Sequence, residues 1–170
     1  YAEHIFRGKE DNAVAILYAS EAEPLQSMTW RELREKTAAL RQHLISQGIR
    51  EGDCIVGYLP CIPEATIAFL AANSLGAIWS SCSPDFGTQS VIDRFAQIEP
   101  KILVAVGEYP YGGKRFDKSG VVKGIVDAIP TIKSTIVVGE HQGITDSTIT
   151  WADALKTRGQ LAFTRVPFNH

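Results

Sequence analysis

The sequence predicts an α/β fold: a mostly parallel sheet, flanked by helices on both faces in a doubly wound arrangement. From Cys54 onward, short apolar strands alternate with helical segments, which is the pattern of successive strand–helix–strand units. The segment Ile102–Val106 is apolar at every position, as a strand buried on both faces should be. We expect right-handed crossovers between the strands. No linker or internal repeat divides the chain, so we expect a single unit.

The amino-terminal part is predicted to contain one strand and one long helix. The strand covers Ala13–Ala19 and is apolar enough to be buried. Thr29 and Glu32 have the spacing of a capping box, in which each side chain accepts a hydrogen bond from the other residue's backbone amide. The helix that they open should extend to about Gln47, because Gly48 offers the left-handed conformation that ends many helices.

The later elements follow from apolar runs and from the residues that break them. A strand over Cys54–Leu59 precedes a helix that Pro63 opens, since the missing proline amide costs nothing at the first helical position. Gly76 ends this helix. The remaining expected elements are a strand over Ala77–Ser81, a helix over Thr88–Ile98, the strand Ile102–Val106, a polar loop over residues 108–120, a helix over Val121–Ala128, a strand over Thr135–Val138, a short helix capped by Thr150, and an aperiodic tail from Leu161 to His170.

Composition excludes several classes of protein. The 170 residues are 45% hydrophobic and 21% charged with a net charge of -2, which is ordinary for a globular protein and predicts no nucleic-acid partner. No apolar run reaches the roughly 18 residues of a transmembrane helix, so we expect no membrane partner. The three cysteines, Cys54, Cys61 and Cys82, fit neither a disulfide scaffold nor a metal site, which favours a reduced, cytoplasmic protein.

The common nucleotide and catalytic motifs are absent. The sequence has no GxGxxG after a strand, no phosphate-binding GxxxxGK[ST], no HExxH and no GxSxG. The histidines His4, His43, His141 and His170 are scattered, and we expect no metal site. His43 is predicted to be a solvated residue on a polar helix face.

A small polar cluster, Ser80-Ser81-Cys82-Ser83, ends the predicted strand over Ala77–Ser81. Ligands bind at the carboxyl ends of parallel strands, and small hydroxyl residues let a polar ligand approach the backbone. The alternative is that Ser83-Pro84-Asp85 forms a turn and caps the next helix. Cys82 has no histidine nearby in the sequence, which argues against a nucleophile.

The segment Tyr109–Arg115 follows another predicted strand end. Gly112 and Gly113 expose amides, Lys114 and Arg115 supply cations, and the tyrosines supply flat faces, a combination that suits a phosphate and an aromatic base. The alternative is an ordinary flexible surface loop.

Ordered short motifs give the chain a resemblance to the AMP-forming acyl-CoA synthetases, the adenylate-forming ligases. They are Thr29-Trp30-Arg31-Glu32-Leu33, Gly48, Gly52-Asp53, Leu59-Pro60, Pro63-Glu64, Phe69-Leu70-Ala71 and Leu75-Gly76-Ala77. Within that family, the chain is similar to the branch that activates acetoacetate in the segments Ile78–Gly87, Val91–Phe95, Gln97–Lys101 and Tyr111–Lys114. The resemblance spans nearly the whole chain and is weakest over Gly139–Gln160.

The resemblance implies a two-step reaction in the full-length enzyme. A carboxylate, acetoacetate in this branch, attacks the α-phosphate of ATP to give an acyl-adenylate and pyrophosphate, with Mg²⁺ offsetting the phosphate charge. The thiol of CoA then displaces AMP. By position, the residues on the CoA side would be Ser80, Ser81, Tyr111, Gly112, Gly113 and Lys114, with Arg115 adjacent. In the acetyl-CoA synthetase relatives, glycines stand at the place of Ser80 and Ser81, and arginines stand in the place of the segment Tyr111–Lys114. This chain has serines at the first place and one lysine, Lys114, in the second.

The resemblance also implies that residues 1–170 are the amino-terminal part of the large domain. The phosphate-binding loop of the family is expected just after His170, and the Mg²⁺ motif and the catalytic lysine later still. We therefore expect no catalytic residue in this chain, no activity from it alone, and the rest of its own chain as its partner. Two alternatives stay open: a ligase for acetate or propionate, and a non-catalytic flavodoxin-like binding module.

Overall fold

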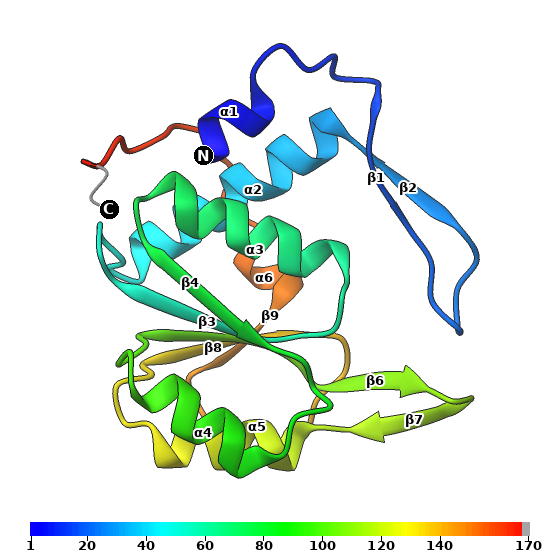
Figure 1. The fold of residues 1–170 in the computed structure, drawn as a ribbon, viewed down its shortest axis with the longest axis vertical. Helices are drawn as coiled ribbons and strands as arrows, with labels where there is room; N and C mark the ends of the chain where they lie inside the picture. The colour runs from blue at the N-terminus through cyan, green and yellow to red at the C-terminus, as the bar shows by residue number, and fades with distance from the viewer. Residues whose placement is uncertain (168–170) are drawn as a thin grey trace.

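A five-stranded parallel sheet lies at the centre of the protein in the computed structural model, which describes residues 1–167 (Figure 1). Its strands lie in the order β4-β3-β5-β8-β9, and every neighbouring pair is parallel. The strands are β3 (Cys54–Tyr58), β4 (Ile78–Cys82), β5 (Ile102–Val106), β8 (Ser134–Val138) and β9 (Thr148–Thr150). The predicted α/β fold with a mostly parallel sheet is confirmed.

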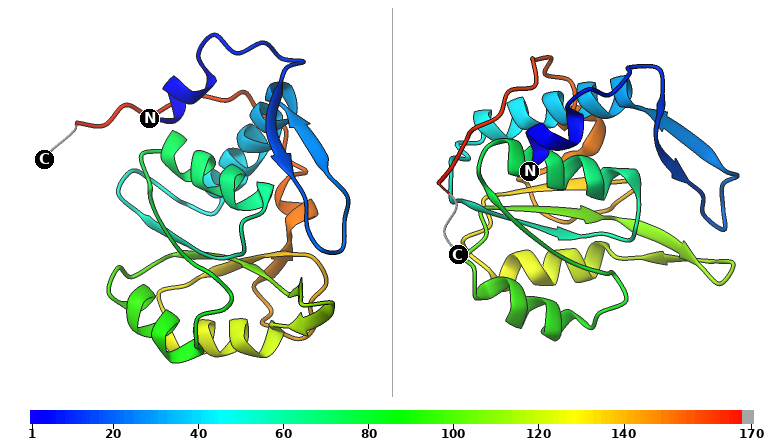
Figure 2. Two further views of the ribbon diagram at one scale, coloured as in Figure 1. Left: turned by 45° about the vertical axis from the view of Figure 1, so that its right-hand side comes forward. Right: turned by 45° about the horizontal axis from the view of Figure 1, so that its top comes forward.

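Helices cover both faces of this sheet (Figures 1 and 2). One face is covered by α2 (Trp30–Ser46), α3 (Pro63–Ser74) and α6 (Trp151–Ala154), and the other by α4 (Thr88–Ala96) and α5 (Ser119–Ala128). Strand β5 contributes alternately to the two cores: Ile102 and Val104 belong to one, Leu103 and Ala105 to the other. All four are at most 1% exposed. The sequence Ile102–Val106 is continuously apolar because both of its faces are buried.

The winding of the chain reverses between β3 and β5. From β3 the chain passes through α3 to the edge strand β4, and from β4 it returns through α4, on the opposite face, to β5 on the other side of β3. In such sheets the crevice for ligands lies outside the carboxyl ends of the strands at which the winding reverses. The topology therefore places the expected ligand site at the carboxyl ends of β3 and β5.

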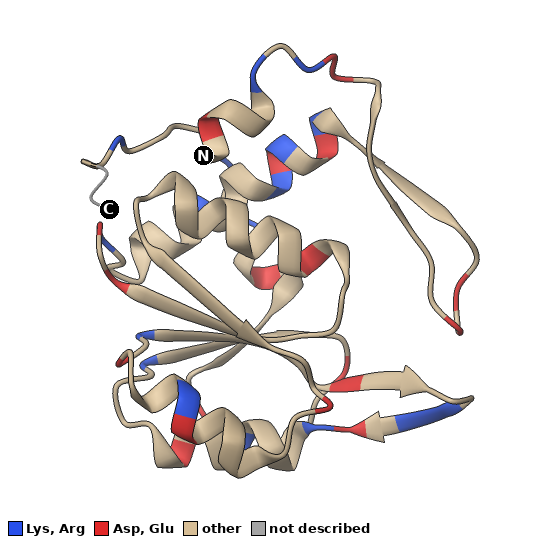
Figure 3. Ribbon diagram, viewed as in Figure 1, with Lys and Arg blue, Asp and Glu red and all other residues tan. Residues whose placement is uncertain are grey.

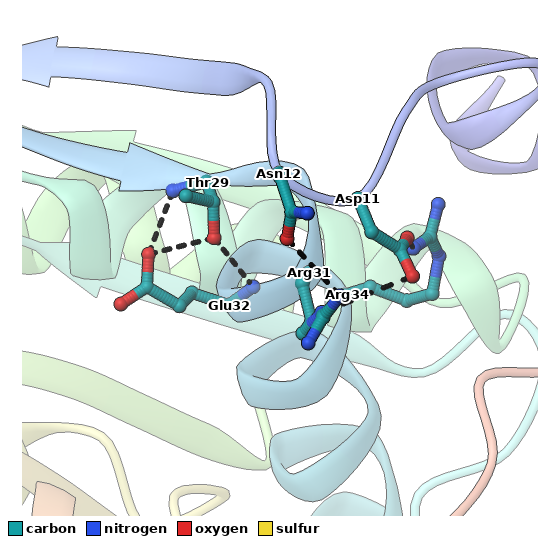
Figure 4. A network of polar contacts seen from close by, with 6 residues as sticks. All are labelled: Asp11, Asn12, Thr29, Arg31, Glu32 and Arg34. Atoms are coloured by element: carbon teal, nitrogen blue, oxygen red, sulfur yellow. Dashed lines mark hydrogen bonds and ion pairs between the residues drawn. The ribbon is translucent and has the colours of Figure 1, made fainter.

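The predicted capping box opens α2 (Figure 4). The Thr29 amide donates a hydrogen bond to Glu32 Oε2 at 2.7 Å, and the Glu32 amide donates to Thr29 Oγ1 at 3.3 Å. Two arginines of the first turns, Arg31 and Arg34, hold the segment that precedes β1 (Val14–Tyr18) through Asn12 and Asp11. These contacts attach the amino-terminal hairpin to the helical layer.

The strand expected over Ala13–Ala19 exists as β1, but its predicted burial is wrong. It pairs with β2 (Gln26–Thr29) in a separate antiparallel hairpin, outside the parallel sheet. Val14 and Leu17 are 52% and 65% exposed. An apolar run alone does not distinguish a central strand from a hairpin strand.

The polar loop expected over residues 108–120 is also wrong. Strands β6 (Glu108–Tyr111) and β7 (Lys114–Asp117) form an antiparallel hairpin there, and α5 begins at Ser119. The connecting Gly112 and Gly113 have φ angles of +59° and +72°, as a two-residue hairpin turn with matching twist requires.

Three short elements, α1 (Ala2–Phe6), β2 and β9, were not expected from the sequence. The expected aperiodic tail contains no helix or strand through residue 167. Its last three residues, including His170, lie outside the described residues.

Candidate functional site

A cleft of about 350 Å³ opens at the carboxyl ends of β3, β5 and β8. Its floor includes Pro60 and Cys61 after β3, Val106 at the end of β5, and Gly139 after β8. Its sides come from the two hairpins, β1–β2 and β6–β7, which extend beyond the sheet in the same direction (Figure 2). The cleft therefore lies where the winding reverses, the place at which doubly wound folds bind ligands.

The serine cluster lies on the edge strand β4, and its two leading residues face opposite ways. Ser80 pairs in register with Val56 and Ser81 with Gly57. Successive side chains of a strand point to opposite faces, so Ser81 shares a face with Trp79, and Ser80 lies on the other. Only one of the two serines can therefore line a given side of the sheet.

Gly57 gives Trp79 and Ser81 their positions. A Cβ at residue 57 would lie 2.6 Å from Trp79 Cζ2 and 3.3 Å from Ser81 Cβ. Both approaches are closer than ordinary van der Waals contact, so the Trp79 ring occupies the space of the missing side chain. Gly57 is not among the residues predicted from the sequence, although an isolated glycine inside a strand is a recognised signal of close approach.

The end of β4 continues into a fixed turn. The Ser83 hydroxyl accepts a hydrogen bond from the Asp85 amide at 3.3 Å and donates to Asp85 Oδ2 at 2.9 Å. The buried Tyr58 hydroxyl donates to the Pro84 carbonyl at 2.8 Å. Burial, followed by the nearby Asp85 charge, raises the pKa of Tyr58. The turn half of the alternative interpretation is confirmed.

The capping half of that interpretation is wrong. The N-cap of α4 is Gly87, which has no side chain to accept a hydrogen bond. The serine cluster thus contributes to the turn before α4 but does not cap the helix.

The β6–β7 hairpin carries the other candidate residues. Tyr111 is 62% exposed, and Lys114 and Arg115 are also exposed. Arg115 forms an ion pair with Glu108, whereas Lys114 forms no ion pair within residues 1–167. Lys114 is therefore the more available of the two cations for an anionic ligand.

The turn of this hairpin already holds an anion. The Gly113 amide donates a hydrogen bond to Glu21 Oε2 at 2.9 Å, from a residue in the β1–β2 turn. The amides of Gly113 and then Gly112 lower the pKa of Glu21. Glu21 is not among the residues predicted from the sequence, because no local pattern relates two residues that lie 92 positions apart.

Asp85 and Tyr109 join the two candidate segments. Asp85 follows the serine cluster, Tyr109 lies on β6, and the tyrosine hydroxyl donates a hydrogen bond to the carboxylate. Lys118 follows β7 directly, and its ammonium lies 5.3 Å from the centre of the Tyr109 ring. The structure thus brings the hairpin next to the turn that follows Ser80 and Ser81.

The remaining polar candidates carry less chemistry. Cys82 is buried, and burial raises the pKa of its thiol, which disfavours the nucleophilic thiolate. Among residues 1–167, no group of His, Cys, Asp and Glu has the arrangement of a metal site. In the same part of the chain, no helix has the length and apolar character needed to span a membrane.

His43 is more buried than the sequence indicated. It is only partly exposed, and its Nε2 atom is buried without a hydrogen-bond partner among the described residues. Burial lowers the pKa of the imidazole. The prediction of a solvated surface residue is therefore wrong.

Comparison with known proteins gives a consistent result over the full chain. The sequence model of the family described as "AMP-binding enzyme" matches residues 3–162. Acetoacetyl-CoA synthetase of Macaca fascicularis is 38% identical over 183 aligned positions, which cover 100% of this chain and 27% of that protein. Acetoacetyl-coenzyme A synthetase of Rhizobium meliloti (strain 1021) is 37% identical over 178 positions, with the same coverage.

A solved structure, that of acetoacetyl-CoA synthetase from Streptomyces lividans, has the same fold. The two structures superpose with a TM-score of 0.93 at 38% sequence identity. The matched region covers 99% of this chain and 27% of the Streptomyces lividans chain. The chain therefore spans 27% of the length of these relatives.

Proposed function

The chain belongs to the AMP-binding enzyme family, and from this premise we propose that it is the amino-terminal part of the large domain of an acetoacetate–CoA ligase. The proposed full-length enzyme joins acetoacetate to AMP with release of pyrophosphate, and then transfers the acyl group to the thiol of CoA with release of AMP. The observation that carries this proposal is the similarity to acetoacetyl-CoA synthetases along the whole chain, in sequence and in fold. That similarity favours a ligase over a flavodoxin-like module.

We propose that this chain contributes residues to the binding site for CoA. The proposed contacts are Ser80, Ser81, Tyr111, Gly112, Gly113, Lys114 and Arg115. The Gly112–Gly113 turn supports the assignment, because the Gly113 amide already donates a hydrogen bond to a carboxylate oxygen, and a phosphate oxygen can accept the same kind of hydrogen bond. Lys114 supplies a cation beside that turn. Because Ser80 and Ser81 face opposite sides of the sheet, we expect only one of them to contact the pantetheine arm.

Among residues 1–167, no group of side chains fits the Mg²⁺ that the reaction needs. Mg²⁺ prefers several oxygen ligands, and residues 1–167 offer no cluster of carboxylates that would hold it. We assign ATP, Mg²⁺ and the catalytic residues to the full-length enzyme, and no residue of this chain to catalysis. The cytoplasmic location is proposed from the number and spacing of the cysteines.

The full-length protein tests the proposal directly. We expect acetoacetate-dependent exchange of labelled pyrophosphate into ATP, followed by acetoacetyl-CoA formation when CoA is added. Acetate and propionate serve as matched acids, because they differ from acetoacetate only in the acyl chain. Exchange that is supported by acetate or propionate but not by acetoacetate would contradict the proposed substrate, and no exchange with any acid would contradict the proposed reaction.

A further inference from the structure

The tips of the two hairpins lie side by side in all three ribbon views (Figures 1 and 2). Figure 3 shows acidic residues at the tip of β1–β2 and basic residues at the start of β7. The bond between Glu21 and the Gly113 amide joins these tips at 2.9 Å. The hairpin turn proposed for CoA is therefore covered by a carboxylate of the same chain.

The covered turn has the geometry of an anion site. Gly112 and Gly113 both have positive φ, and consecutive amides in such turns form a concavity that binds anions. Lys114 follows directly and has no ion pair among residues 1–167. A phosphate and the Glu21 carboxylate would use the same amides, so the two cannot bind together.

Neither hairpin depends on Glu21 for its attachment. The β6–β7 hairpin is held by the bond from Tyr109 to Asp85, and the base of β1–β2 by the contacts of Arg31 and Arg34 with Asn12 and Asp11. The Glu21 side chain itself is exposed. Removing its charge should therefore free the turn without detaching either hairpin.

We propose that Glu21 is an internal competitor for the phosphate-binding turn and weakens the binding of CoA. This inference rests on the proposed function of the turn. A phosphate can bind only those molecules in which Glu21 has left the amides. The apparent Kd of the ligand is therefore the intrinsic Kd divided by the fraction of molecules in which the amides are free. A doubly charged phosphate displaces the singly charged carboxylate, and the β1–β2 tip then moves away from β7.

The experiment compares the full-length enzyme with its Glu21→Gln and Glu21→Ala variants. We expect the KM for CoA to fall by roughly twofold to fivefold, the scale of an exposed charged contact, with the KM values of ATP and acetoacetate unchanged. Calorimetric titration with adenosine 3′,5′-bisphosphate, the phosphate-bearing half of CoA, should show tighter binding by a similar factor. The matched control is Glu10→Gln, which removes one exposed carboxylate that makes no side-chain hydrogen bond or ion pair within the described chain.

The outcomes separate this inference from the proposed function. A KM for CoA that is unchanged or raised in both Glu21 variants overturns the competitor role, even if the enzyme makes acetoacetyl-CoA. An equal fall in the Glu10→Gln control also overturns it, because net charge would then explain the effect. A wild-type enzyme that forms no acyl-CoA from any acid overturns the proposed function itself.

Discussion

The hydroxyl of Tyr109 donates a hydrogen bond to the carboxylate of Asp85, and this bond connects the β6–β7 hairpin to the turn after β4. The two residues lie 24 positions apart, on segments that share no backbone pairing. Asp85 is itself held by the Ser83 hydroxyl. The hairpin is therefore linked to the serine cluster by two side-chain hydrogen bonds in series.

The ionisation of Tyr109 reports on this contact. The bond to Asp85 raises the pKa of Tyr109 to about 12, because the carboxylate accepts a hydrogen bond from the neutral phenol and ionisation would remove that donor and create a phenolate beside a carboxylate. We expect Asp85→Asn to lower that pKa toward the ordinary value of 10.0. Ultraviolet difference spectroscopy of tyrosinate between pH 10 and 12 should show one additional ionised tyrosine in the variant. When both proteins also carry Tyr109→Phe, Asp85→Asn should make no such difference to the spectrum. A difference that persists in that background would belong to another tyrosine.

Replacement of Lys114 separates CoA binding from ATP binding. In the full-length enzyme, Lys114→Ala should raise the KM for CoA by about threefold to tenfold, since Lys114 is a cation beside the glycine turn and has no ion pair among residues 1–167. The KM for ATP should change less. The control is Lys123→Ala, on α5, whose ammonium pairs with Asp127 on the helix surface. Equal effects of Lys114→Ala on the KM values of both substrates would count against the assignment.

The sequence predicts features that depend on neighbouring residues better than those that depend on distant ones. The capping box of Thr29 and Glu32 was predictable because both of its hydrogen bonds span three residues. The Gly112–Gly113 turn had a usable signal, two glycines between short strands, but the charged and proline residues around it suggested a loop. The contact of Glu21 with Gly113 had none, because it arises only after both hairpins have folded.

Burial was the least predictable property for a similar reason. The run from Ala13 to Ala19 has the composition of a core strand, yet it forms one side of an exposed hairpin. His43 lies among polar neighbours in the sequence, yet the packing of α2 buries its Nε2 atom. Both errors concern what covers an element, which is determined by tertiary structure rather than by the element's own pattern.

Gly57 is predicted to be essential for the position of Trp79. In Gly57→Ala, the new Cβ would lie 2.6 Å from the ring, so the ring must move, at a cost of about 1–3 kcal/mol as for other overpacked cores. We expect a lower melting temperature of the full-length protein and a changed tryptophan emission spectrum. The matched control is Gly124→Ala on α5, where a new Cβ would lie 3.8 Å from Thr88 Cγ2, an ordinary contact. That control should be neutral or stabilising by up to about 1 kcal/mol, because alanine favours helix more than glycine does. A similar loss in both variants would contradict the steric explanation.

The buried Nε2 atom of His43 predicts a loss of stability in acid. Burial lowers the pKa of this imidazole in the folded protein below its ordinary value of 6.5, so the unfolded chain binds a proton more readily than the folded one. The stabilising contribution is therefore fully present above the unfolded pKa and is lost as pH falls from about 6.5 through the lower folded pKa. We expect His43→Gln, which cannot take up the proton, to weaken the dependence of the melting temperature on pH between about 7.5 and 5. The exposed His4 provides the control, since His4→Gln should keep the wild-type dependence. If His43→Gln keeps it as well, the buried nitrogen is not the source of the acid sensitivity.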